Sequence, residues 1–328
     1  MNRVTLRQLE YFVAVVDAGS VTLASRQVHV SQATVSMAIA QLERDLDADL
    51  LIRHRSKGVA PTRAGRELAA RARRLLSMAE ELESSALAGD SEMSGPLEIG
   101  CVSSLSPHVI PALAAHFDAE HPQVAFDYRE GAAGELQEAL VEGALDLAIV
   151  FSRQCEDAVD STELAEVVLN VMLPASHPLR DRAEVSFAEI AHEPAILIDL
   201  PPSRDRSIEF MRAAGVEPRI RWTSENLATV TALVANGLGY SLSYSLPGAQ
   251  SPVSSGVVEI PVADPVPGNA ISAVLPKGIR PSRRVDEAVR FLRRRLAELE
   301  TGAAPSPDGD GAEASRLPES NRRPIHYE

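Results

Sequence analysis

The chain has 328 residues and a mass of 35.2 kDa, which fits about two compact domains and excludes a single small module. Hydrophobic residues make up 45% and charged residues 24%, which excludes global disorder. The net charge of −14 argues against uniform attraction to nucleic acid. The chain has only two cysteines, Cys101 and Cys155, and their wide separation argues against a disulfide scaffold or a zinc finger. With no apolar run long enough to span a membrane and no apolar signal segment at the start, we expect a cytoplasmic protein without a membrane partner.

The first 62 residues predict an all-α unit with a helix, a tight turn and a helix at its centre. Thr5 and Gln8 have the spacing of a capping box and begin one helix, while Ser20 and Ser31 are suited to cap a second and a third. The third helix has an apolar face that we expect to pack inward, formed by Val35, Ile39, Leu42 and Leu46. Its opposite face is poor in charge and rich in small residues, which suits close approach to the floor of a DNA major groove.

A basic hairpin and a long helix follow. Two short apolar runs around Ser56-Lys57-Gly58 predict a two-stranded wing, and residues 50–77 carry a net charge of +7. Taken alone, that charge also fits a solvated helix face. The helix expected over residues 63–90 has a near-heptad apolar seam, in which the larger members are Leu68, Leu75 and Leu82. It could lie on its own domain, but we interpret it as a dimerising linker, because Gly89–Gly95 resembles a hinge.

From Leu97 the pattern changes to short apolar strands that alternate with helices, which is typical of an α/β domain. We expect strands at 97–102, 124–129, 145–151, 167–173, 195–198, 219–223, 240–243 and 271–275, and helices at 107–120, 134–142, 203–214, 224–236 and 282–299. Residues 91–300 thus predict two lobes in series, 93–162 plus 266–300 and 163–265, with a cleft between them. The remainder, residues 301–328, is rich in Gly, Pro, Ser and acid and predicts a disordered tail.

Several stretches of the chain resemble the LysR-type transcriptional regulators. In the first 90 residues these are Leu6-Arg7-Gln8-Leu9-Glu10-Tyr11-Phe12, Gly19-Ser20-Val21-Thr22-Leu23-Ala24-Ser25, Val30-Ser31-Gln32-Ala33-Thr34-Val35-Ser36, Gln41-Leu42-Glu43 and Pro61-Thr62-Arg63-Ala64-Gly65. Further on they are Glu142-Gly143-Ala144-Leu145-Asp146-Leu147-Ala148-Ile149, His177-Pro178-Leu179 and Val234-Ala235-Asn236-Gly237-Leu238-Gly239-Tyr240. The resemblance implies a bacterial activator or repressor with a winged helix-turn-helix. It also implies a C-terminal half similar to periplasmic binding proteins, which senses a small molecule, and assembly into a homodimer or homotetramer on double-stranded promoter DNA at the nucleoid.

By this resemblance, the DNA-binding residues lie at the start of the third helix and in the wing: Ser31, Gln32, Thr34, Ser36, Met37, Arg53, Arg55 and Lys57. Gln32 and Ser36 would read bases and backbone, and the wing arginines would contact phosphates or the minor groove. Relatives commonly carry a polar or basic residue after the motif serine. Met37 at that position favours apolar contact, for example with a thymine methyl group.

The resemblance also implies an effector pocket between the lobes, lined by residues that follow strands and begin helices. Here these are Ser103, Ser104, Ser203, Arg204 and Asn226, and we expect the effector to be a small organic anion. Serines at such places also serve as helix caps, and Arg204 could form a surface ion pair instead. The segment 131–134 lacks a hydroxyl often found there in relatives, so that lobe would hold a ligand through backbone N–H groups.

Two other functions are alternatives to this interpretation. An enzyme is disfavoured because the sequence has no G-x-S-x-G elbow, P-loop or H-E-x-x-H motif, and His108, His116 and His121 lie around one helix without a partnered carboxylate pattern. A redox switch through cysteines is the second alternative, but Cys101 ends an apolar strand and Cys155 has no resolving thiol nearby. We therefore expect no catalytic residues, no cofactor and no metal site.

Overall fold

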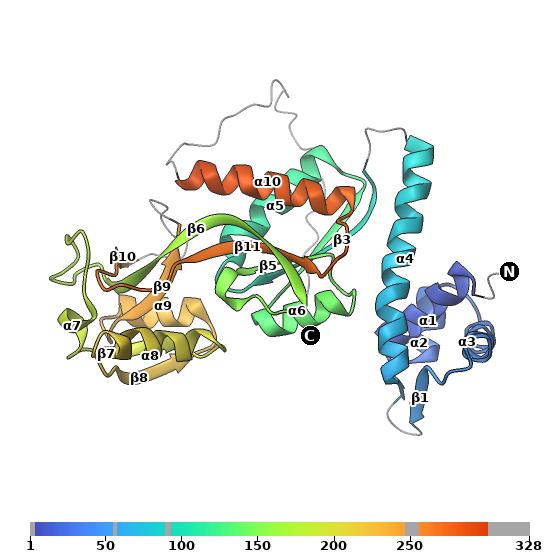
Figure 1. Cartoon of the computed structure of the whole chain (residues 1–328), viewed down its shortest axis with the longest axis horizontal. Helices are drawn as coiled ribbons and strands as arrows, with labels where there is room; N and C mark the ends of the chain where they lie inside the picture. Colours follow the sequence, from blue (N-terminus) through green and yellow to red (C-terminus); the bar gives the residue numbers. More distant parts are fainter. Residues whose placement is uncertain (1–3, 55–57, 89–92, 247–255, 301–328) are drawn as a thin grey trace, which may run out of the picture.

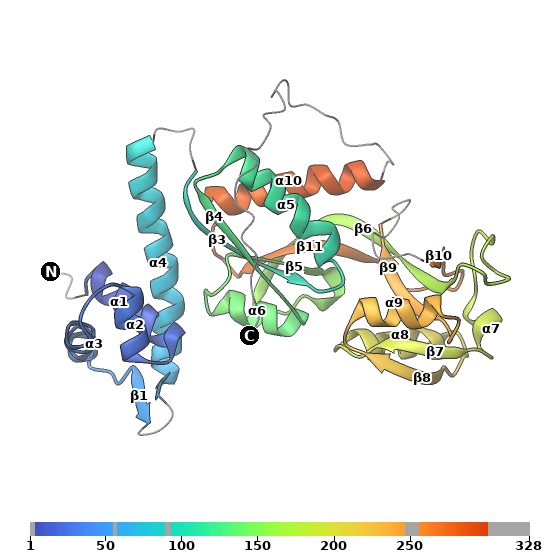
Figure 2. The same ribbon diagram turned by 180° about the vertical axis from the view of Figure 1, so that it is seen from behind.

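A computed structural model describes residues 4–54, 58–88, 93–246 and 256–300. The N-terminal unit and the long helix that follows it lie at one end of the molecule, and two α/β lobes extend away from them (Figures 1 and 2). The N-terminal elements are α1 (Leu6–Ala18), α2 (Val21–Gln27), α3 (Gln32–Leu46), β1 (Leu51–His54), β2 (Gly58–Pro61) and the long α4 (Arg63–Ala88). This is the predicted winged helix-turn-helix.

The predicted caps begin the first three helices. The Thr5 hydroxyl accepts from the backbone of Gln8, whose side chain accepts in return from the Thr5 N–H at 2.8 Å. Ser20 and Ser31 likewise accept a backbone N–H at the start of α2 and α3. Each cap satisfies a backbone donor that the first helical turn leaves unpaired. The positions where these helices begin are therefore determined by residues only three positions apart.

The inward face of α3 is as expected at three of its four positions. Val35, Ile39 and Leu42 are buried against α1 and α2, but Leu46 is 40% exposed. The prediction for Leu46 was wrong because α3 ends at this residue, where Asp47 turns into the left-handed region and no longer continues the helical face.

The start of α4 packs tightly under the wing. Thr62 caps the helix by accepting from the Gly65 N–H at 3.0 Å. A Cβ atom at Gly65 would lie 2.1 Å from the Leu50 carbonyl oxygen, so only glycine allows this close approach.

Lobe I contains a twisted sheet with helices on both faces. Its strands are β3 (Gly95–Val102), β4 (Val124–Gly131), β5 (Leu147–Phe151) and β11 (Asn269–Pro276), together with the first half of a long strand β6 (Val159–Pro174). Strand β3 pairs in parallel with β4 and β5, as the predicted βαβ pattern requires, and β11 joins antiparallel. Helices α5 (Ser106–Glu120) and α10 (Arg283–Glu300) cover one face, and α6 (Ala133–Val141) covers the other (Figure 1).

Lobe II is built on the second half of β6. This half pairs with β9 (Ser241–Ser245) and β10 (Val257–Pro261), while β7 (Pro194–Ile198) and β8 (Arg219–Ser224) form a parallel pair beside β9. Helices α7 (Phe187–Ile190), α8 (Ser203–Ala213) and α9 (Leu227–Ala235) pack on these strands, and a short 3-10 helix η1 (Ser152–Gln154) follows β5 in lobe I.

Strand β6 is longer than the sequence predicted and belongs to both lobes. Five of its first eight residues are polar, four of them in the run 160–163, so this half contains no continuous apolar run that would predict a strand. The lobe I core extends along β6 to Val167, and the lobe II core begins at Leu169, so the expected division between residues 162 and 163 falls inside the strand. The two lobes are therefore joined by continuous hydrogen-bonded strand rather than by a loop.

Helix α4 is fastened to lobe I by arginine side chains. Arg73 donates to the Glu142 carbonyl at 2.6 Å and pairs with Asp17 of α1, and Arg74 donates to the Val141 carbonyl at 2.9 Å. Both arginines were counted in the basic stretch at residues 50–77. Because both side chains hydrogen-bond to lobe I, their positive charges contribute to the contact between α4 and lobe I.

A buried arginine strengthens the same joint from α10. Arg284 is 2% exposed and donates to the Ser94 carbonyl at 2.7 Å and to the Ser77 hydroxyl at 3.0 Å. Residues 89–92 of the expected hinge and the expected tail, 301–328, lie outside the described residues. Of the helices in the described ranges, none has the length and apolar character needed to cross a bilayer.

Candidate functional site

A cavity of about 110 Å³ lies between the two lobes. Lobe I contributes the segments that follow β3, β4 and β5, and lobe II contributes the ends of β7 and β8 and the exposed side of β9. The volume is several times the roughly 10–15 Å³ that one water molecule needs by this measure, so the cavity has room for a small organic molecule. Its position at the ends of strands from both lobes is where α/β proteins commonly bind ligands.

Three helices begin at this cavity without a side-chain cap. In the described structure, the N-cap positions of α5, α6 and α8 are Leu105, Ala132 and Pro202, and none of them offers a side-chain acceptor to its helix. At α8 the N–H groups of Ser203 and Arg204 already donate to the Leu200 carbonyl, but each helix start still carries a partial positive charge. Together they make the cavity wall suitable for an anionic or acceptor group.

The structure brings only part of the expected effector set to the cavity. Ser103, Ser104 and Ser203 line it. Arg204 does not: its guanidinium pairs with Asp199 at 3.0 Å, with both side chains about two-fifths exposed, which is the alternative surface ion pair. Asn226 does not line it either, because its side chain caps α9 by accepting from the Thr229 N–H at 3.2 Å.

The arginine that lines the cavity is Arg206, which was not among the expected effector-binding residues. Two residues along a helix correspond to a rotation of about 200°, so Arg206 faces the cavity while Arg204 faces away. From lobe II it donates to the Arg153 carbonyl in η1 of lobe I and so bridges the two lobes. Burial, and to a lesser degree the charge of Arg153, lower the pKa of the Arg206 guanidinium below its ordinary value.

A buried hydroxyl on α9 also faces the cavity. Thr231 is 4% exposed, and its hydroxyl has no hydrogen-bond partner among the described residues. Nearby, burial raises the pKa of the Tyr244 hydroxyl, an effect that Asn269 opposes. An unpaired buried hydroxyl costs about 1–3 kcal/mol, so its persistence beside a cavity points to a partner supplied by a ligand.

The cavity lining also contains two acidic side chains. Glu259 of β10 accepts from the Ser243 hydroxyl at 2.8 Å, and Glu225 lies at the end of β8. His108 of α5 lines the cavity from lobe I, and burial lowers its pKa although Glu259 opposes that shift. The cavity therefore has a cationic region at Arg206 and an acidic region at Glu259. The small organic anion expected from the sequence does not account for the acidic region.

The outer face of α3 is exposed and neighbours the start of α1. Gln32 is exposed and Met37 is 66% exposed, whereas Ser36 is half-buried. The hydroxyls of Ser31 and Thr34 lie 2.8 Å apart at the start of the helix. Of the wing residues, Arg53 lies in β1, and Arg55 and Lys57 lie outside the described residues.

A shallow groove runs between α1 and α3 beside this face. Its lining includes Arg7 and Tyr11 of α1 and Met37, Gln41 and Arg44 of α3. Arg7 was not among the expected DNA-binding residues, although its place in the first turn of the helix, two residues after the Thr5 cap, and its positive charge could have indicated it. A basic residue at this place lies where DNA phosphates would flank a helix in the major groove.

The apolar seam of α4 divides into two parts. Leu68 is half-buried and packs on the core of its own winged-helix unit, with Ala72 next to it. Further along, Leu75 and Leu82 are 46% and 71% exposed, and Met78 between them is 66% exposed. The first part of the seam thus packs on the core of the N-terminal unit, and the second part is an apolar face that is exposed to solvent in the single chain.

Comparison with known families accounts for both halves of this arrangement. Residues 6–66 match the family described as bacterial regulatory helix-turn-helix protein, lysR family, and residues 90–297 match the LysR substrate binding domain. The chain belongs to the LysR family. It is a DNA-binding transcriptional regulator of that family, as its sequence resemblance implied.

Individual LysR-family proteins are similar over most of the chain. The regulator OxyR of Escherichia coli K12 is 28% identical over 292 residues, which are 89% of this chain and 95% of OxyR, and the uncharacterised regulator YvbU of Bacillus subtilis is 28% identical over 77% of this chain and 86% of its own. The crystal structure of HinK from Pseudomonas aeruginosa is 31% identical, covers 89% of this chain and 98% of HinK, and has a TM-score of 0.56. CbnR bound to its target DNA shares the fold at 23% identity, over 89% of this chain and all of CbnR, with a TM-score of 0.52.

Some LysR-family relatives are named hydrogen peroxide-inducible genes activators, which makes the two cysteines of this regulator relevant. Cys101 is fully buried, and burial raises the pKa of its thiol, with Glu130 adding to the effect. Burial also raises the pKa of the Cys155 thiol, although Ser161 opposes it. Because the thiolate is the reactive form, both environments disfavour reaction with an oxidant.

Proposed function

We propose that this LysR-family regulator changes its binding to promoter DNA when a small organic molecule occupies the cavity between its lobes. The observation that carries the proposal is the buried, unpaired hydroxyl of Thr231 in the cavity wall. Ligand-induced closure of two lobes around such a cavity changes their relative angle, and that change can be passed to a DNA-binding unit attached to one of them. Since Arg73 and Arg74 tie α4 to lobe I, a route to the winged helix exists.

The effector site in this proposal consists of Ser103, Ser104, Ser203, Arg206 and Thr231, so Arg206 and Thr231 replace Arg204 and Asn226. The ligand carries an anionic or acceptor group toward Arg206 and the uncapped helix starts, where a guanidinium can bind a carboxylate with two hydrogen bonds. A hydrogen-bond donor at its other end would meet the acidic region. An amphoteric small molecule fits these two regions better than a simple anion does.

DNA binding in this proposal uses the exposed start and outer face of α3 together with the wing. Gln32 and Met37 approach base edges with Ser36, while Ser31 and Thr34 lie near the phosphates. The wing residues Arg53, Arg55 and Lys57 contact the DNA backbone or minor groove. The regulator then acts in the cytoplasm at the nucleoid and carries out no catalysis of its own.

We assign residues 1–62 to DNA binding, 63–90 to the linker helix and 91–300 to effector binding. The exposed face of α4 at Leu75 and Leu82 is proposed as the dimer contact, whereas Leu68 supports the fold of its own unit. A dimer, or a tetramer made of two dimers, would place two winged helices on neighbouring half-sites.

The test is a thermal-shift screen of small organic acids, amines and amino acids, followed by calorimetry with any compound that stabilises the protein. Arg206→Gln should weaken binding of that compound by about tenfold or more, which corresponds to about 1.4 kcal/mol. Arg204→Gln is the matched control, because it removes the same type of side chain two residues away and outside the cavity. Equal affinity for the wild type and the Arg206 variant would overturn the site.

Redox sensing through Cys101 and Cys155 is the second candidate, supported by the names of the peroxide-responsive relatives. The raised pKa of both thiols argues against it. A Cys101→Ser, Cys155→Ala double variant that loses its promoter response to peroxide would support it over effector binding.

A further inference from the structure

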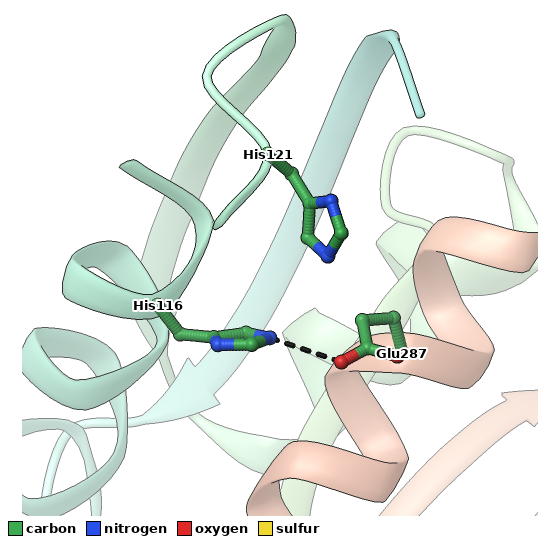
Figure 3. Close-up of side chains that lie close together, drawn as sticks. All are labelled: His116, His121 and Glu287. Atoms are coloured by element: carbon green, nitrogen blue, oxygen red, sulfur yellow. Dashed lines mark hydrogen bonds and ion pairs between the residues drawn. The ribbon is translucent and has the colours of Figure 1, made fainter. Parts of the chain in front are cut away.

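Two histidines and a glutamate meet on the outer side of lobe I, away from the cavity. His116 lies on α5, His121 directly follows that helix, and Glu287 lies on α10 (Figure 3). One nitrogen of each ring and one carboxylate oxygen all lie within 4.8 Å of one another. The sequence has no Cys/His cluster at metal-ligand spacing, so we expected no metal site, but α10 brings a carboxylate to these histidines from 171 positions away.

The pair His116 and Glu287 is held in a fixed geometry. The His116 Nε2 atom lies 3.0 Å from Glu287 Oε1, and the two side chains are 10% and 17% exposed. The His116 ring stacks on Phe291 of α10, with ring centres 4.2 Å apart and planes within 10°. Arg290 binds the other carboxylate oxygen, Oε2, at 2.8 Å, so it orients the group and leaves Oε1 directed at the histidines.

The spacing suits a tetrahedral divalent ion. Zinc bonds of about 2.1 Å separate two ligands of a tetrahedron by about 3.4 Å, close to the 3.0 Å between His116 and Glu287. Since no two ligand atoms are more than 4.8 Å apart, a pair has to close by at most about 1.4 Å, and side-chain rotation at His121, which is half-exposed and follows the helix end, allows such a movement. Two imidazole nitrogens and one carboxylate oxygen form a donor set that favours zinc and its neighbours in the transition series over magnesium or calcium.

We infer that His116, His121 and Glu287 form a binding site for a zinc-type divalent transition-metal ion, with a fourth position open to water. The bound ion links α5 to α10. It thereby braces the helical face of lobe I close to Arg284, which connects α10 to the linker helix α4. The positive charge of Arg290 beside the carboxylate lowers the affinity for the ion, so this site is weaker than one built without that arginine.

The experiment is calorimetric titration of the full-length protein, stripped of metal with a chelator, with zinc chloride, and absorption spectroscopy with cobalt(II). The wild type should bind one ion per chain at this site and give the visible spectrum of tetrahedral cobalt. Glu287→Gln and His121→Asn should each weaken this binding by about tenfold or more. Arg290→Gln should bind zinc more tightly than the wild type does.

His192→Ala is the matched control, because His192 is a 76% exposed histidine beside a glutamate in lobe II. It should leave the site unchanged. His116→Ala removes a side chain that packs on Phe291, so the circular dichroism of this variant is first compared with that of the wild type. If the variant fails to fold, Glu287→Gln and His121→Asn decide the test. A wild type that shows no stoichiometric binding, or variants at all three positions that bind zinc and cobalt as the wild type does, would overturn the site.

Discussion

Replacing Thr231 with valine should stabilise the protein without ligand and at the same time weaken effector binding. Valine replaces the threonine hydroxyl with a methyl group of similar size, so the substitution removes the hydroxyl without leaving a void. The threonine is 4% exposed and its hydroxyl lacks a partner in the described structure, so the wild type bears the desolvation cost of an unpaired polar group. Removing it should raise the free energy of unfolding by about 1 kcal/mol or more.

For an effector domain of about 200 residues, that gain corresponds to a rise in the melting temperature of about 2–4 °C. Differential scanning calorimetry measures the rise, and titration of the compound found in the screen measures the affinity, which should fall by about fivefold or more because a hydrogen bond is lost.

Thr229→Val is the control, since it makes the same replacement on an exposed turn of the same helix and should change neither quantity. A Thr231→Val protein that melts lower than the wild type would mean that the hydroxyl is already bonded in the ligand-free protein, and the argument for the cavity would fail.

Four further outcomes are expected. Leu82→Asp, at a site 71% exposed on α4, should weaken the dimer in analytical ultracentrifugation, because the face would then bury a carboxylate, and an unchanged oligomer would remove α4 from the interface. Arg53→Ala should weaken binding to every DNA sequence and flatten its salt dependence, whereas Gln32→Ala should cost specific sites about 1–3 kcal/mol, so salt titrations that fail to separate the two would contradict the assignment. Arg73→Ala, which loses the 2.6 Å bond to lobe I, should increase hydrogen exchange along the joint, and unchanged exchange would refute the coupling. Burial lowers the pKa of His108, so protonation favours the unfolded chain: stability should fall as the pH drops below about 6.5, and His108→Asn should reduce that slope in denaturation curves measured across this range.

Much of the fold was determined by short-range sequence. The serine and threonine caps begin α1, α2 and α3 where expected, because a cap needs only a side-chain oxygen and the N–H three residues later. The alternation of apolar strands and helices gave the parallel βαβ unit of lobe I, since buried parallel strands are continuous apolar runs. The polar first half of β6 gave no such run and was missed for that reason.

The sites depended on information that local sequence does not contain. The choice between Arg204 and Arg206 is decided by which side of α8 meets lobe I, and the lack of a partner for Thr231 is a property of its surroundings after folding. Glu287 reaches His116 only because α10 returns to pack beside α5. Caps, periodicity and motifs act over a few residues and can be read along the chain, whereas a binding site is a meeting of side chains from distant segments, which only tertiary packing brings together.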